Sequence, residues 1–180
     1  MGDPRNPARA NELWNPVRIK VLLNELDSLK EFCIVSGGWA WHLMSPPHEE
    51  LKLYHDHKDI DLYVNPKDFS TVVTGLIGSG YAHIWSRFDK VSHGKFYRYE
   101  KIVDGAVLSG TVKVLIDLFL QDVPFIEVNG FKIVEPSYLL TLYRKKVHLT
   151  DDCSAVIGAR KLVEKGINPI GRKELIQKYL

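Results

Sequence analysis

Hydrophobic residues spaced three and four positions apart predict several amphipathic helices along the chain. One follows Asn15-Pro16 and another follows Asn65-Pro66, and each pair is typical of a helix start, with a capping side chain before a proline. The apolar faces of these two helices consist of Ile19, Leu22, Leu23, Leu26 and Leu29, and of Phe69, Val72, Val73, Leu76 and Ile77. Further helices are expected at 39–44, from Pro136, near Thr150-Asp151 and from Pro169.

Between these helices, short apolar runs and two-residue alternation predict strands. Ile60, Leu62 and Val64 alternate with more polar neighbours, which is the period of a strand. Asn129-Gly130 lies between two short apolar runs and is a strong signal for a hairpin turn. The expected strands are 32–35, 59–64, 81–85, 95–102, 112–120, 125–128 and 131–134.

This order of elements predicts an α+β protein with a mixed sheet flanked by helices and a C-terminal helical segment. We expect a disordered leader at 1–11, a core at 12–134 and the helical segment at 135–180. A chain of 180 residues has room for one domain. Because 45% of its residues are hydrophobic and 26% charged, it can form an ordinary globular core.

Charge and cysteine content narrow the class of protein further. The formal net charge of +2 is far from the basic balance of a dedicated nucleic-acid binder. Cys33 and Cys153 are too few for a disulfide framework. The polar N-terminus is not a signal peptide, and no apolar run approaches the roughly 18 residues of a membrane span. We therefore expect a cytoplasmic protein.

The sharpest candidate for chemistry is the pair Asp59 and Asp61. Residues two apart on a strand point to the same side, so both carboxylates would project together while Ile60 enters the core. Two neighbouring negative charges are unfavourable unless a cation lies between them, and oxygen ligands favour Mg²⁺ or Mn²⁺. The alternative is two solvated acids on an exposed strand.

Two further features strengthen the metal interpretation. Ser36-Gly37-Gly38 ends an apolar run and opens a helix, where free N–H groups can bind phosphate; a simple tight turn is the alternative. Asp117 lies inside the apolar run 114–120, where burying an acid without a partner is costly. The alternative for Asp117 is a strand end that faces water.

Together these pieces resemble a known family. Ser36-Gly37-Gly38-Trp39-Ala40, His57-Lys58-Asp59-Ile60-Asp61-Leu62 and the later Asp117 look like the nucleotidyltransferase superfamily of the DNA-polymerase-beta type. The motifs are closest to those of aminoglycoside and lincosamide nucleotidyltransferases. The resemblance covers roughly residues 32–163.

The resemblance implies Mg²⁺-dependent transfer of a nucleoside monophosphate from a nucleoside triphosphate, with ATP favoured, to a hydroxyl acceptor. In this family the glycine turn holds the phosphates, paired aspartates bind two magnesium ions, and a third aspartate is a ligand or general base. The catalytic and metal-binding roles fall on Asp59, Asp61 and Asp117. The nucleotide-binding roles fall on Ser36, Gly37, Gly38, His57 and Lys145, with Lys146 as a neighbour that could serve instead of Lys145.

The acceptor is less well defined than the nucleotide. A small, sugar-like molecule is favoured over RNA or protein, and the near-neutral charge supports the preference over RNA. An aromatic and basic stretch could line an acceptor cleft, although alternating aromatic residues more often form core and cross-strand pairs. The residues of this stretch are Tyr81, Trp85, Arg87, Phe88, His93, Phe96, Tyr97 and Tyr99.

Two other functions remain open. In the first, the chain keeps the fold as a non-catalytic nucleotide- or partner-binding module, for example one component of a toxin–antitoxin pair. A loop rich in histidine and acid also permits a transition-metal hydrolase, although it lacks the spacing of a closed zinc site. The loop residues are His48, Glu49, Glu50, His55, Asp56 and His57.

Overall fold

The computed structural model describes residues 16–45, 59–86, 89, 92, 94–104, 111–146 and 149–168. The predictions on the leader, on the histidine loop with His57, and on the helix from Pro169 lie outside these residues. So do those on Arg87, Phe88 and His93.

Within these residues the core of the fold is one mixed sheet of seven strands in the order β3-β4-β5-β2-β1-β7-β6. Its strands are β1 (Ile34–Val35), β2 (Ile60–Val64), β3 (Ala82–Ile84), β4 (Phe96–Asp104), β5 (Thr111–Leu120), β6 (Phe125–Val128) and β7 (Phe131–Val134). The central pair β2 and β5 runs parallel, as does the pair β1 and β7, and the other neighbours are antiparallel. This arrangement confirms the expected α+β class with a mixed sheet.

Helices α2 (Pro16–Leu29) and α4 (Phe69–Gly78) belong to the apolar side of the sheet. Glu25 of α2 accepts hydrogen bonds from Tyr81 and Lys101, and the ring of Phe69 lies 4.7 Å from that of Tyr97. The predicted apolar faces of both helices contribute fully buried residues, which are Ile19, Leu22, Leu23, Leu26 and Leu76. Because these apolar side chains are buried on the side of the sheet that α2 and α4 cover, polar residues lie on the other side.

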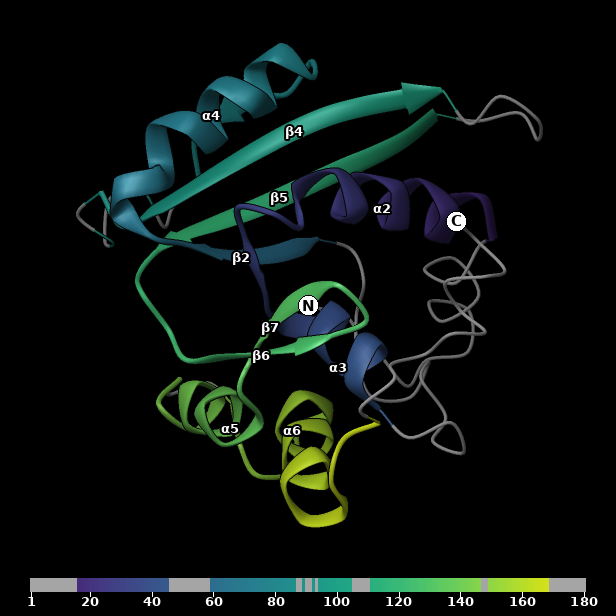
Figure 1. Ribbon diagram of the computed structural model, residues 1–180, viewed down its shortest axis with the longest axis vertical. Helices are drawn as coiled ribbons and strands as arrows, with labels where there is room; N and C mark the ends of the chain where they lie inside the picture. Colours follow the sequence, from purple (N-terminus) through teal and green to yellow (C-terminus); the bar gives the residue numbers. More distant parts are fainter. Residues whose placement is uncertain are drawn as a thin grey trace.

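The remaining helices are α3 (Gly37–Met44), α5 (Pro136–Arg144) and α6 (Ser154–Lys165). Helices α5 and α6 pack against each other, α6 also contacts α3, and the pair lies at the end of the molecule away from α4 (Figure 1). Glu135 caps α5, because its carboxylate accepts hydrogen bonds from the backbone N–H groups of Ser137 and Tyr138.

The local signals in the sequence predict most elements within one or two residues. The Asn129-Gly130 hairpin is confirmed, with φ of 52° and 81° at its two turn residues. Asn65-Pro66 opens a 3₁₀ turn (Pro66–Asp68) before α4, because the Asn65 side chain accepts a hydrogen bond from Lys67 N. Both cysteines are free thiols, and burial raises the pKa of Cys33 to about 12. None of the described helices has the length and apolar character needed to cross a membrane.

Candidate active site

Three charged side chains occupy matched positions on adjacent strands at the centre of the sheet. Asp61 of β2 pairs in register with Asp117 of β5, and Asp117 pairs in register with Arg98 of β4. Residues opposite each other in a sheet project to the same face. The row Asp61–Asp117–Arg98 therefore lies on the face opposite to α2 and α4.

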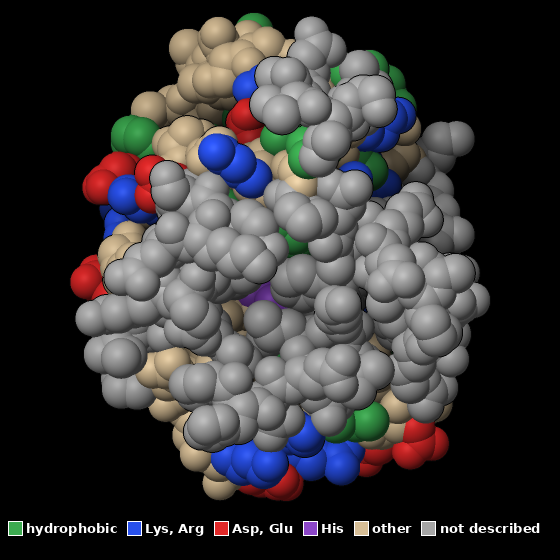
Figure 2. Space-filling view, turned by 90° about the vertical axis from the view of Figure 1, so that its right-hand side faces the viewer, with side chains coloured by type: hydrophobic (Ala, Val, Ile, Leu, Met, Phe, Trp, Pro, Cys, Tyr) green, Lys and Arg blue, Asp and Glu red, His purple; other side chains and the backbone are tan. Residues whose placement is uncertain are grey.

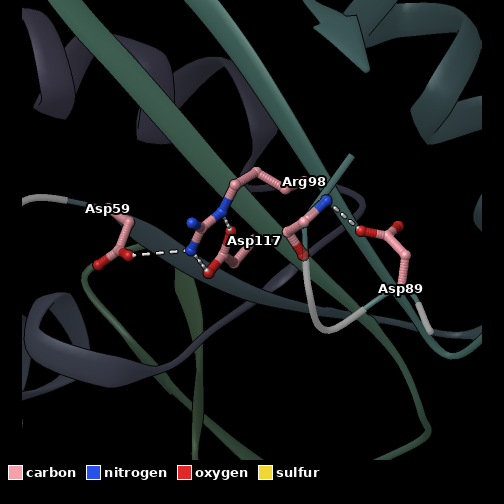
Figure 3. A network of polar contacts seen from close by, with 5 residues as sticks. Asp59, Asp89, Arg98 and Asp117 are labelled. Carbon is pink, nitrogen blue, oxygen red and sulfur yellow. Dashed lines mark hydrogen bonds and ion pairs between the residues drawn. The ribbon is translucent and has the colours of Figure 1, made fainter. Parts of the chain in front are cut away.

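The guanidinium group of Arg98 forms a bidentate contact with the Asp117 carboxylate (Figure 3). Nε donates to Oδ1 of Asp117 and Nη2 donates to Oδ2, each at 2.5 Å. Nη2 also lies 3.4 Å from Oδ2 of Asp59, directly before β2. The hydrogen bonds to Asp117, with the charges of all three aspartates, raise the pKa of Arg98 above its ordinary value. Asp117 is only 5% exposed, so it is a buried, paired acid and not a strand end facing water.

The structure brings the predicted acids near one another, and their proximity affects the pKa of Asp61. Loss of water around its carboxyl group raises the pKa of Asp61 to about 8, and the negative charges of Asp59 and Asp117 add to the shift. The positive charges of Lys146 and Arg98 act in the opposite direction. Burial and the two neighbouring acids thus outweigh the basic residues, and Asp61 keeps its proton to a higher pH than an ordinary aspartate does.

Asparagine at position 61 is expected to stabilise the protein in the absence of metal. The folded-state pKa of Asp61 lies above its ordinary 3.8, so folding binds a proton between those values and wild-type stability falls as the pH rises toward 8. Asp61→Asn removes this loss, so its advantage in stability should be small at pH 4 and grow to several kcal/mol as the pH rises to 8. Urea unfolding in EDTA at both pH values measures it, and parallel curves for the two proteins would contradict it.

The glycine turn lies directly against this carboxyl group. Ser36 is buried and its N–H donates to the backbone oxygen of Asp61 at 2.8 Å, while its own carbonyl accepts from Ala40 in the first turn of α3. Gly37 has a φ of +61°, and a Cβ atom there would lie 2.0 Å from Oδ2 of Asp61. Glycine is thus required at 37 both for its backbone conformation and for this close approach.

Helix α5 and the segment directly after it contribute two more side chains to the site. Tyr143 is buried, and both its burial and the charges of Asp61 and Asp59 raise the pKa of its phenol. The Lys146 ammonium lies 5.7 Å from the Tyr143 ring centre, and its charge lowers the pKa of Asp61. Of the two lysines considered in the sequence, Lys146 is therefore the one whose charge acts on Asp61. The nucleotide-binding role of Lys145, which caps α5 through its backbone N–H, stays a prediction.

The sequence did not reveal Arg98 as a site residue. Its signal was indirect, because an acid buried in the apolar β5 needs a cationic partner and the aromatic strand β4 carries an arginine. The residues of the predicted aromatic stretch differ in their exposure to solvent. Tyr81, Phe96 and Tyr99 are buried, as core residues would be, whereas Trp85 is 82% exposed.

Carboxylate oxygens are the ligands that Mg²⁺ and Mn²⁺ prefer, so the chemistry of Asp59, Asp61 and Asp117 suits such an ion. Across the described residues, however, no three His, Cys, Asp or Glu side chains converge closely enough to hold a metal ion as they stand. Both oxygens of Asp117 are engaged by Arg98. Arg98 thus occupies the two oxygens that Asp117 would offer to a metal ion.

Comparison with known proteins adds evidence on the fold. No family model and no curated protein matches the chain. Among solved structures, JHP933 from Helicobacter pylori superposes with a TM-score of 0.56 at 12% identity, over 94% of this chain and 72% of that one. The lincosamide antibiotic adenylyltransferase LnuA, with lincomycin bound, superposes with a TM-score of 0.50 at 14% identity, over 79% of this chain and 96% of that one. The chain is thus similar in fold to a nucleotidyltransferase, as the glycine turn and the aspartates led us to expect.

Proposed function

We propose that this protein transfers a nucleoside monophosphate from a nucleoside triphosphate, with ATP favoured, to a hydroxyl group of a small molecule. The observation that carries the proposal is the row of Asp61 and Asp117 on adjacent strands, with the Gly37 turn packed against Asp61. Acids that bind metal and a turn that binds phosphate must lie side by side for this chemistry. The similarity in fold to an adenylyltransferase agrees with it.

In this proposal each part of the site has a separate task. The first turn of α3 at Gly37 and Gly38 binds the phosphates through its backbone N–H groups. Asp59, Asp61 and Asp117 hold Mg²⁺ or Mn²⁺, which when bound supplies neutralisation of the phosphate charge and a lowered pKa for the acceptor hydroxyl. Asp117 orients that hydroxyl toward the α-phosphorus.

The reaction forms one bond and breaks one. The acceptor oxygen bonds to the α-phosphorus, the bond from this phosphorus to the bridging oxygen of the β-phosphate breaks, and pyrophosphate leaves. The hydroxyl proton passes to a nearby carboxylate or to water. No covalent intermediate on the protein is needed, because positioning and charge neutralisation suffice for phosphoryl chemistry.

A small acceptor suits the distribution of charge better than a nucleic acid does. At the end of the molecule where α5 and α6 lie, basic side chains are interspersed with acidic ones (Figure 2). Arg144 and Arg160 both lie within 3.6 Å of the Asp151 carboxylate, which partly neutralises them. A surface that binds a polynucleotide backbone has an excess of one sign. LnuA, whose fold is similar, has an antibiotic as its ligand.

Lys146 is expected to contribute to nucleotide binding. Its charge reaches Asp61, so it also acts on a triphosphate bound beside that residue. Lys146→Ala should raise KM for the nucleotide about tenfold, because a charge-assisted contact contributes about 1.5 kcal/mol. Initial rates at varied nucleotide concentration measure this, with Lys145→Ala as the matched control on the next residue. A larger effect at Lys145 would contradict this assignment and support the role predicted for Lys145 from the sequence.

The proposed function is tested by label transfer. The protein, Mg²⁺ and each α-labelled nucleoside triphosphate are incubated with a cell extract, which is then separated into small-molecule, RNA and protein fractions. Label in the small-molecule fraction, absent with the Asp59→Asn, Asp61→Asn double variant, is the expected result. Nucleotide binding with no transfer to any fraction would instead favour the non-catalytic binding module.

A further inference from the structure

Arg98 occupies the position between the acids where a cation is needed. Its guanidinium group engages both oxygens of Asp117 at 2.5 Å, and the same Nη2 lies 3.4 Å from Asp59. Asp117 is buried, and the Arg98 side chain is only 20% exposed, so water does little to weaken the pair. A bidentate pair of this kind also fixes the orientation of the carboxylate.

The buried carboxylate of Asp117 requires a positive charge beside it, which either a divalent metal ion or Arg98 supplies. Both would use lone pairs on the two oxygens of Asp117. With Arg98 in place, the acids in the described residues do not converge as a metal centre. Arg98 engages Asp59 and Asp61 less closely than it engages Asp117. It reaches Asp59 through one longer contact, and it acts on Asp61 only through its charge.

We propose that Arg98 is a built-in counter-cation that competes with a divalent metal ion for Asp117. This inference rests on the proposed function, because it takes the three acids as metal ligands. In the free protein one ion binds at Asp59 and Asp61, and Asp117 stays paired with Arg98. A second ion binds only when Arg98 releases Asp117. Arg98 is thus a positioning residue that holds the Asp117 carboxylate in one orientation before the second ion arrives.

The proposal is tested by counting bound Mn²⁺ in the absence of nucleotide, by electron paramagnetic resonance of the free ion and by calorimetry. The wild-type protein should bind one ion. Arg98→Met, which keeps an unbranched side chain of about the length of the arginine stem and removes the guanidinium charge, should bind a second ion, or bind it at least about tenfold more tightly. Arg98→Lys should lie between the two, because lysine keeps the charge and loses the two-pronged geometry.

A double variant controls for damage to the fold. Arg98→Met alone removes the bidentate contact and the positive charge from the buried Asp117, so it should melt at a lower temperature than the wild type and gain more from added Mn²⁺. Arg98→Met with Asp117→Asn removes both charges and should fold without metal. It should bind one ion with wild-type affinity, because its second site lacks the Asp117 carboxylate.

The outcomes separate this inference from the proposed function. Equal Mn²⁺ stoichiometry and affinity in the wild type and Arg98→Met would overturn the competition while leaving a metal-dependent transferase in place. Two tightly bound ions in the wild type would do the same. No Mn²⁺ bound by either protein would overturn both the inference and the metal-dependent function.

Discussion

Replacing Asp61 with asparagine is expected to lower nucleotidyl transfer by at least about 10³-fold, because the site loses a carboxylate that stabilises charge in the transition state. The same variant should be more stable than the wild type at pH 8 without metal, since burial and the charges of Asp59 and Asp117 oppose ionisation of Asp61. A protein that is more stable and inactive is the signature of a residue kept for function at a cost to the fold. Single-turnover rates and urea unfolding at pH 8 measure the two effects.

Asp122 offers a matched control for this substitution. It is an exposed acid in the loop after β5, outside the row formed by Asp61, Asp117 and Arg98. Asp122→Asn removes the same charge from the protein and should leave both the rate and the stability close to wild type. Retention of full activity by Asp61→Asn would exclude the acid row as the centre of catalysis.

Alanine at position 37 is expected to reduce transfer by at least about 10²-fold, because a misplaced reacting group costs that much in rate. The new Cβ atom would lie 2.0 Å from Oδ2 and 3.0 Å from Cβ of Asp61, so the carboxyl group must turn away from its position beside Asp117. The backbone adds strain, because φ at Gly37 is +61°. The loss should appear mainly in kcat, since the change displaces a catalytic group.

Two comparisons separate the collision from the strain. Gly80 also has a positive φ, of 88°, but a Cβ atom there meets nothing within 4 Å, so Gly80→Ala measures strain alone and should cost about 1 kcal/mol of stability with normal activity. If Gly37→Ala acts by moving Asp61, the double variant with Asp61→Asn should be no less active than Asp61→Asn alone. Additive losses in that double variant would contradict the explanation.

Most of the fold follows from local sequence signals. Period-two alternation at Ile60, Leu62 and Val64 and the turn at Asn129-Gly130 predict their elements because both depend on neighbouring residues. Helix α3 begins at Gly37, two residues before the apolar pattern starts, because the glycines themselves adopt its first turn. Propensity did not indicate this start, since glycine is a poor helix former.

The site was predicted only in part, because its assembly depends on contacts between distant segments. Asp61 and Asp117 meet since β2 and β5 are parallel neighbours, a pairing that no local pattern specifies. Arg98 joins them through the register of β4 against β5. An arginine among aromatic strand residues gives no sign of which strand will lie beside it, whereas the cost of burying Asp117 did indicate that a partner exists.

Nucleotidyl transfer is tested by comparing α-labelled with γ-labelled ATP, using an acceptor identified from the small-molecule fraction. The acceptor is expected to gain the α-label and never the γ-label, with one pyrophosphate released for each adduct. The Asp59→Asn, Asp61→Asn double variant should form neither product. Transfer of the γ-label would identify a kinase, and hydrolysis without any adduct would identify a hydrolase; either result would contradict nucleotidyl transfer at the row of Asp61 and Asp117.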